Sequence, residues 1–329
     1  MSSATIIWSL SLSFSSVNYE PFGIASPAEL QSKLAEYEYL ADETLSTTIF
    51  LSLALARPLF LEGEAGVGKT EVAKALSRWL GTELIRLQCY EGIDVSQALY
   101  EWDYSKQLLH LRAAESGSVD GIHSKINIEE LESELYGERF LLKRPILAAL
   151  SSTGGMPPVL LIDELDRADD EFEAFLLEVL SEYSVTIPEI GQIRAKIPPI
   201  VVITSNRTRD VHDALKRRCL YCWVEHPTFE REVEIVNLRA PEVGLILARQ
   251  VAGLVERLRT MGLFKPPGVA ETIDWAQSLA ILGAKELNEL NERLVEETLG
   301  SVLKYKEDSD RVRASSLSEL VRSAVQRAR

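Results

Sequence analysis

Residues 58–80 read PLFLEGEAGVGKTEVAKALSRWL. The apolar run 58–61 predicts a short buried strand, and the spacing of apolar residues over 69–80 predicts a helix. Between them, residues 63–70 match G-x-x-x-x-G-K-[ST], a glycine-rich loop that binds phosphate when it joins a strand to a helix. This order of elements predicts a parallel α/β sheet that binds a nucleotide.

The predicted loop has a physical reason to bind phosphate. Its glycines let successive backbone N–H groups turn toward one anion, and the helix that follows contributes its positive N-terminal end. We expect Lys69 to reach the β and γ phosphates of ATP and the Thr70 hydroxyl to bind Mg²⁺. The residues predicted to bind the nucleotide are Gly63, Glu64, Ala65, Gly66, Val67, Gly68, Lys69 and Thr70.

A second apolar run, VLLI at 159–162, ends in the acidic pair Asp163 and Glu164. The carboxyl ends of strands in α/β sheets border the crevice in which ligands bind. We expect Asp163 to bind Mg²⁺, directly or through water, and Glu164 to orient and polarise the attacking water. Acidic residues also favour the first turn of a helix, and we assign Asp166 and most of the acids after it to that role.

A third apolar run, IVVITS at 200–205, ends in Asn206. An amide at this edge of the sheet can hold the attacking water and sense the γ-phosphate. The alternative is an asparagine that only forms a turn.

The rest of the chain predicts two structural units. Strand patterns at 83–88 and 220–225 alternate with helical patterns, which predicts a parallel sheet covered by helices on both faces. After residue 226 only helical patterns remain, one of them over 284–305. The predicted boundaries are an N-terminal tail over 1–25, an α/β nucleotide-binding domain over 26–226, an all-helical lid domain over 227–307 and a basic tail over 308–329.

The basic tail begins near a predicted linker, residues 307–310. Residues 311–329 carry five arginines against one glutamate. We expect one short exposed helix, with an acidic partner as the alternative to a solvated surface.

The composition limits the possible partners. The chain has 329 residues, 50 of them acidic and 35 basic, and a formal net charge of −15. This balance argues against broad binding to nucleic acid or to an anionic membrane. Three cysteines fit a reducing compartment, and no run is long enough to span a bilayer, so we expect a cytoplasmic protein.

Cys219 and Cys222 are spaced Cys-x-x-Cys, as in many zinc and redox sites. The strand pattern over 220–225 puts residues three apart on opposite faces, and no glycine between them supports a metal knuckle. A redox pair would need a helix N-terminus to lower one thiol pKa. We therefore expect inert cysteines.

Four motifs together resemble the AAA+ ATPases. GEAGVGKT, LLIDELD, VVITSN and the Arg-Arg pair before Cys219 occur in the order and approximate spacing of that superfamily, and the helical domain resembles its lid. The hairpin pattern over 185–197 and the insertion between the second and third core strands resemble the MoxR branch. The longer strings LIRLQCYEGIDVSQALYEWDY, RCLYCWVEHPTFEREVEIV and DWAQSLAILG resemble CoxD-type accessory ATPases of carbon monoxide dehydrogenase maturation.

The resemblance implies partners and further site residues. It implies a homo-oligomeric ring, expected to be a hexamer, that uses ATP and Mg²⁺ to remodel a client metalloenzyme, a molybdenum hydroxylase. Arg218 matches the arginine that AAA+ subunits insert into a neighbour's ATP site, with Arg217 as the alternative. MoxR-like lids usually present an arginine to the γ-phosphate, and the nearest match here is Lys285; an ordinary exposed lysine is the alternative.

Two other functions compete with the remodelling ATPase. One is a scaffold that assembles on ATP with little turnover, which would not need Glu164. The other is a nucleic-acid motor, which the net charge disfavours. The aromatic residues between 90 and 104 could grip a client, although packing within the insertion explains them as well.

Overall fold

The computed structural model describes residues 22–116, 134–288 and 292–328. The expected N-terminal tail lies largely outside these residues. Five strands form one sheet in the order β2-β5-β8-β1-β9, with every neighbouring pair parallel. Their bounds are β1 Leu59–Glu62, β2 Leu84–Gln88, β5 Val159–Asp163, β8 Ile200–Ser205 and β9 Leu220–Trp223. The predicted parallel α/β sheet is confirmed, and its carboxyl ends meet at one edge.

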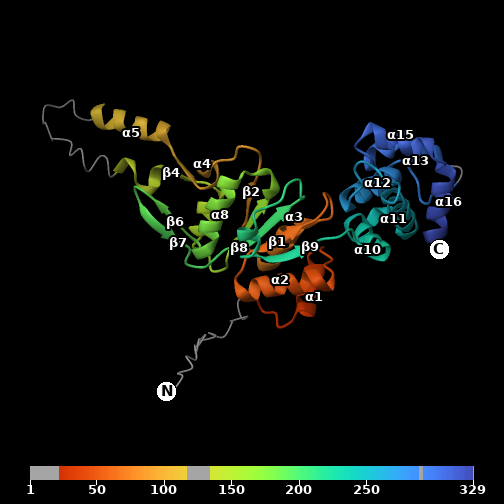
Figure 1. The fold of residues 1–329 in the computed structure, drawn as a ribbon, viewed down its shortest axis with the longest axis horizontal. Helices are drawn as coiled ribbons and strands as arrows, with labels where there is room; N and C mark the ends of the chain where they lie inside the picture. The colour runs from red at the N-terminus through yellow and green to blue at the C-terminus, as the bar shows by residue number, and fades with distance from the viewer. Residues whose placement is uncertain (1–21, 117–133, 289–291, 329) are drawn as a thin grey trace, which may run out of the picture.

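Helices cover both faces of the sheet (Figure 1). On one face the strands pack against α1 (Pro27–Glu36), α2 (Glu43–Leu55) and α3 (Lys69–Leu80). On the other they pack against α7 (Pro145–Leu150), α8 (Asp170–Glu182) and the short α9 (Asp213–Lys216). Strands buried on both faces read as continuous apolar runs. The strands could therefore be predicted from the sequence as apolar runs.

An insertion and a hairpin project from the sheet on the side away from the C-terminal helices (Figure 1). The insertion follows β2 and contains α4 (Val95–Ala98), β3 (Tyr100–Trp102), α5 (Tyr104–Ser116), the short helix η1 (Glu138–Phe140) and β4 (Leu141–Lys143). The hairpin consists of β6 (Ser184–Ile187) and β7 (Gly191–Arg194). Of the aromatic residues, Trp102 is buried against Tyr136, whereas Tyr104 is exposed.

The C-terminal helices form a core of their own. They are α10 (Phe229–Arg239), η3 (Pro241–Val243), α11 (Leu245–Arg259), α12 (Val269–Ile281), α13 (Glu292–Glu297) and α14 (Leu299–Val302), followed by α15 (Lys306–Ala314) and α16 (Leu317–Ala328). The expected single helix over 284–305 is therefore wrong. Gln250 on α11 hydrogen-bonds both the N–H and the carbonyl of Leu287, and these backbone groups are then unavailable to a helix.

The prediction of an exposed C-terminal tail is also wrong. Residues 307–310 lie within α15, where buried Asp308 accepts hydrogen bonds from the backbone N–H groups of Phe264 and Lys265. In α16, Leu320, Val321 and Ala324 are buried against the other helices. Figure 1 shows α16 beside α11. The arginines that the structure describes in this segment, Arg311, Arg313, Arg322 and Arg327, are exposed.

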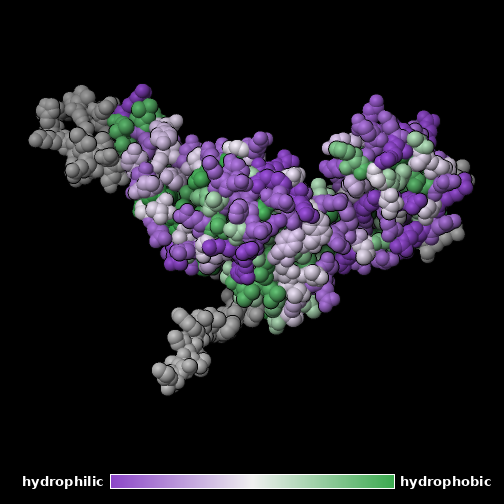
Figure 2. All heavy atoms as spheres, in the orientation of Figure 1, coloured by the Kyte–Doolittle hydropathy of each residue, from purple (hydrophilic) through white to green (hydrophobic). Residues whose placement is uncertain are grey.

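Most of the surface is hydrophilic in the view of Figure 2, with hydrophobic atoms gathered over α2 and α5. α2 exposes Leu51 and Leu55, and α5 exposes Leu108 and Leu109. Within the described ranges, none of the helices combines the length and apolar character needed to cross a bilayer.

Candidate functional site

The glycine-rich loop leaves β1 at the carboxyl edge of the sheet and enters α3. A side chain at Gly63 would collide with the backbone carbonyl of Val224. Gly66 and Gly68 have φ of +81° and +93°, in the left-handed region that favours glycine. The motif is therefore required by local backbone geometry, and the loop has the strand and helix context that phosphate binding needs.

Lys69 begins α3, and its side chain turns back into the loop. Its Nζ donates to the carbonyls of Gly63 (2.8 Å) and Glu64 (2.6 Å). Burial lowers the pKa of Lys69 to about 8, although nearby carboxylates act in the opposite direction. The ammonium thus lies inside the curve of the loop. Phosphate oxygens can replace the two carbonyls there.

Asp163 ends β5 with only 4% of its side chain exposed. Its Oδ1 accepts hydrogen bonds from the hydroxyls of Thr70 (3.1 Å) and Thr204 (2.5 Å). The structure therefore brings together Thr70 and Asp163, the two predicted magnesium ligands. Mg²⁺ prefers oxygen ligands and often takes only one or two from the protein, with phosphates and water completing its shell. This pair of oxygens fits that chemistry.

Glu164 lies beside Asp163 in a left-handed backbone conformation, with φ of 55°. Its N–H donates to Thr204, and its carboxylate accepts from the side-chain amides of Asn206 (3.2 Å) and Gln88 (3.1 Å). Arg167 forms an ion pair with it at 3.0 Å. Glu164 and Asn206, predicted from separate strands, are thus in direct contact. A carboxylate held in this way can orient a water molecule.

Sequence reasoning missed two residues on β2, the edge strand beside β5. Gln88 contacts Glu164, and Arg86 forms an ion pair with Asp163. The signal was present in LIRLQ, where polar Arg86 and Gln88 alternate with apolar residues toward the end of a predicted strand. Only the β2–β5 register, in which Gln88 lies opposite Asp163, shows that they reach the acidic pair.

The assignment of Asp166 as an ordinary helix-start acid is also wrong. Its buried carboxylate accepts hydrogen bonds from the N–H of Asn206 (3.1 Å) and from the N–H and hydroxyl of Thr208. Burial alone would raise the pKa of Asp166, but these hydrogen bonds lower it below its ordinary value. Asp166 thereby fixes the backbone that carries Asn206.

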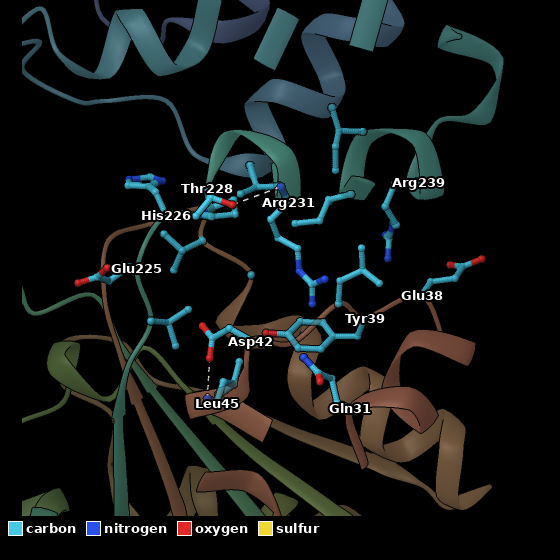
Figure 3. Close-up of a pocket in the computed structure, with 18 residues that line it drawn as sticks. Gln31, Glu38, Tyr39, Asp42, Leu45, Glu225, His226, Thr228, Arg231 and Arg239 are labelled. Carbon is cyan, nitrogen blue, oxygen red and sulfur yellow. Dashed lines mark hydrogen bonds between the residues drawn. The ribbon is translucent and has the colours of Figure 1, made fainter. Parts of the chain in front are cut away.

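A cavity of about 460 Å³ lies next to the phosphate loop, between the sheet and the C-terminal helices. Figure 3 shows Arg231 pointing from α10 toward Asp42 and Tyr39, which precede α2. Apolar Val67, Val224, Ile235 and Ile273 also line it. Its size and its mixture of apolar walls with polar and charged groups suit the nucleoside part of a nucleotide. No motif in the sequence pointed to this cavity.

The helical region contacts the phosphate loop directly. The N–H of Val269, at the start of α12, donates to the Gly66 carbonyl at 2.9 Å, and Gly268 lies against Gly66. Arg231 donates to the Ala41 carbonyl, and Arg239 forms a 3.4 Å ion pair with Glu71 on α3. Helices α10 and α12 therefore border the cavity on the side away from the sheet.

A comparison with protein families agrees with this geometry. Residues 58–219 match the model of the AAA domain, dynein-related subfamily. This stretch of the chain resembles an AAA domain. The order of the parallel strands and the helices that follow them agree with the AAA+ fold, and a resemblance to an AAA domain implies ATP binding.

Solved structures of similar fold include the RuvB Holliday junction branch migration motor of Thermotoga maritima. It is 16% identical, with a TM-score of 0.44, and the match covers 79% of this chain and 69% of that one. A point mutant of that RuvB is 15% identical with a TM-score of 0.45, covering 87% and 73% of the two chains. No curated protein sequence matches the chain significantly.

Arg217 and Arg218 lie on the surface of the AAA domain, at the turn between α9 and β9. Arg57 donates to the carbonyls of Arg217 (2.8 Å), Arg218 (3.0 Å) and Cys219 (3.2 Å). Arg57 precedes β1, whereas the phosphate loop follows it. The backbone that carries the arginine pair is thus one strand length, about 13 Å, from the loop of the same subunit.

Lys285 is not near the phosphate loop, which contradicts its predicted contact with the γ-phosphate. The first turn of α12 contacts Gly66, whereas Lys285 follows the other end of this 13-residue helix. A helix of that length spans about 20 Å. Lys285 is exposed beside a separate cavity with Glu242 and Gly244.

The two cysteines of the Cys-x-x-Cys spacing lie on opposite faces of the sheet, as predicted. Cys219 belongs to the core under α7 and α8, and Cys222 to the core under α1 to α3. Burial raises the pKa of Cys219 to about 12 and that of Cys222 above its ordinary value. The described part of the chain contains no cluster of three or more His, Cys, Asp or Glu side chains suited to a metal.

Proposed function

We propose that the protein hydrolyses ATP and uses the energy to remodel another protein. The observation that carries this proposal is the arrangement around Glu164. Its carboxylate is held by Asn206 and Gln88 next to the Thr70–Asp163 pair, at the mouth of the phosphate loop. A protein that only bound ATP would not need an oriented carboxylate at this place.

The residues divide the chemistry as follows. The loop N–H groups and Lys69 bind the phosphates, and Thr70 and Asp163 hold Mg²⁺, which neutralises charge on the β and γ phosphates when bound. Glu164 accepts a hydrogen bond from the attacking water, and Asn206 orients both Glu164 and that water. The cavity lined by Tyr39 and Arg231 takes the nucleoside.

Arg218 acts in a neighbouring subunit of a homo-oligomeric ring, which we propose to be a hexamer. Three observations support this role: Arg218 is exposed, Arg57 braces its backbone, and that backbone lies beside the start of β1, at the opposite end of the strand from the phosphate loop. An arginine that stabilises the transferring phosphoryl group must then reach it from another chain. A head-to-tail contact of this kind closes into a ring.

The client is a molybdenum hydroxylase, and the setting is the cytoplasm. Support comes from the longer strings that resemble CoxD-type ATPases, among them residues 84–104, which run from β2 into the insertion. The insertion projects away from the helical region (Figure 1) and exposes Tyr104, Leu108 and Leu109. Apolar side chains on a projecting arm can bind a loosened client segment.

The experiment compares wild type with Glu164→Gln, in the presence and absence of client. We expect wild type to release phosphate and Glu164→Gln to bind ATP with little turnover. Co-purification on the Glu164→Gln form should then recover the client. Equal inactivity of both proteins with client present would favour an ATP-switched scaffold. Salt-dependent DNA binding would favour a nucleic-acid motor.

A further inference from the structure

Arg86 contacts Asp163 but has no part in the proposed chemistry. It lies on β2, with 53% of its side chain exposed, and points along the sheet edge toward a carboxylate that is only 4% exposed. Its Nη2 is 2.5 Å and its Nε 3.1 Å from Oδ2 of Asp163. The same Nη2 donates to Oε1 of Gln88 at 2.5 Å. One guanidinium therefore contacts a predicted metal ligand and the amide that holds Glu164.

The two oxygens of Asp163 have different partners. Oδ1 accepts from the hydroxyls of Thr70 and Thr204, whereas Oδ2 accepts from Arg86. Because Oδ2 is occupied, the carboxylate is fixed in the rotation that turns Oδ1 toward Thr70. Partners of this kind, which hold a ligand without touching the metal, tune metal affinity.

Gln88 is oriented by the same contact. When its Oε1 accepts from Arg86, its Nε2 faces Glu164, to which it donates at 3.1 Å. A flipped amide would present oxygen to the carboxylate and lose both hydrogen bonds. Arg86 and Gln88 are two residues apart on β2, so their side chains lie on the same side of the strand. Arg86 can therefore orient two acids, Asp163 directly and Glu164 through Gln88.

We propose that Arg86 is a positioning residue, which turns Asp163 toward Mg²⁺ and Gln88 toward Glu164. This inference rests on the proposed function of the same site. Lysine cannot replace arginine fully, because its single ammonium lacks the planar set of donors that reaches both partners.

The test uses Arg86→Met and Arg86→Lys in the full chain, with Arg144→Met as a matched control. Arg144 forms an Nη2 ion pair of the same length, 2.5 Å, with Glu101, and its side chain is 44% exposed. ATP binding is measured in excess EDTA and across a Mg²⁺ titration, together with kcat, KM and the melting temperature.

We expect Arg86→Met to bind ATP as tightly as wild type in EDTA. Mg²⁺ increases the affinity for ATP, and the Mg²⁺ concentration that gives half of this increase should be about 10–100-fold higher in Arg86→Met than in wild type. Its kcat should fall while KM for ATP at saturating Mg²⁺ changes little. Arg86→Lys should be intermediate, and Arg144→Met should match wild type. Comparable melting temperatures of Arg86→Lys and wild type in EDTA separate these effects from a folding defect.

Other outcomes overturn the inference. An unchanged Mg²⁺ titration would show that Asp163 needs no positioning. A shift toward lower Mg²⁺ would identify Arg86 as a competitor of the metal. Loss of ATP binding in EDTA by both variants would assign Arg86 to the fold. The binding measurements do not depend on turnover, so they test Arg86 even if wild type fails to hydrolyse ATP. Such a failure would contradict the proposed function and not the role of Arg86.

Discussion

Buried Glu62 and half-buried Lys216 form an ion pair next to the start of the phosphate loop. Lys216 Nζ is 3.2 Å from Oε1 of Glu62, whose side chain is 4% exposed, and the Tyr221 hydroxyl donates to the other oxygen at 2.9 Å. Glu62 immediately precedes Gly63, and Lys216 immediately precedes the arginine pair. The pair therefore joins the root of the loop to the segment that bears Arg217 and Arg218.

Lys216→Met should destabilise the protein by about 3–5 kcal/mol, because it leaves the Glu62 carboxylate buried without a counter-charge. The measurement is the free energy of unfolding in denaturant. The double variant Glu62→Gln/Lys216→Met should recover most of the loss, since the amide can still accept from Tyr221. A double variant no more stable than Lys216→Met would show that the charge is not the cause.

ATP binding should weaken as pH rises through about 8. Burial lowers the pKa of Lys69 to about 8, so above that value the side chain of the nucleotide-free protein loses its charge and its attraction for phosphate. ATP should raise this pKa again, and binding near pH 8 should take up protons. Calorimetry in two buffers of different ionisation enthalpy measures that uptake. Lys69→Arg, charged to above about pH 12, should abolish it.

The same shift has a defined effect on stability. Between pH 8 and the ordinary Lys69 pKa of 10.5, the unfolded chain holds a proton that the folded chain has released. The free energy of unfolding contributed by this group therefore rises with pH across that window. A decrease there, in wild type relative to Lys69→Arg, would contradict the assigned direction.

Arg218→Ala should lower turnover by about 10³-fold or more while leaving ATP binding intact. Mixing it with Glu164→Gln should restore partial activity, because some sites then combine an intact Glu164 with an intact Arg218 from the neighbour. Phosphate release from the mixture measures this rescue. Normal turnover by Arg218→Ala, with a loss in Arg217→Ala, would transfer the role to Arg217.

Gly268→Ala should weaken ATP binding by disturbing the contact between α12 and the phosphate loop. An added Cβ would lie 2.7 Å from Gly66 Cα and 2.9 Å from the Ala65 carbonyl. Overpacking of this kind costs about 1–3 kcal/mol. Gly300→Ala on α14 is the control, because a Cβ there meets nothing within 4 Å. Equal ATP affinities of the two variants would show that α12 is not needed for binding.

The sequence predicted the features whose determinants lie close together in the chain. The phosphate loop, the acidic pair and Asn206 each follow a strand whose apolar run is continuous, so motif and structural context appear together. Opposite faces for Cys219 and Cys222 followed from the two-residue period of a strand. Local backbone geometry decides all of these.

Features that depend on long-range register could not be predicted. Arg86 and Gln88 reach the acidic pair only because β2 is the edge strand beside β5. Lys285 resembled a lid residue by its order in the chain, but the length of α12 carries it away from the loop. The packing of α16 is a different case, because the spacing of Leu320, Val321 and Ala324 already indicates an apolar face and the nearby arginines do not prevent its burial.

All three cysteines of the chain are buried, and burial raises the pKa of Cys89 and Cys219 to about 12 and that of Cys222 as well. Thiolates, not thiols, react with maleimides and similar labels. The cysteines of the native protein should therefore react only very slowly with such reagents. One cysteine introduced on exposed α5 would become a selective handle for fluorescent or spin probes, with no need to remove the natural three.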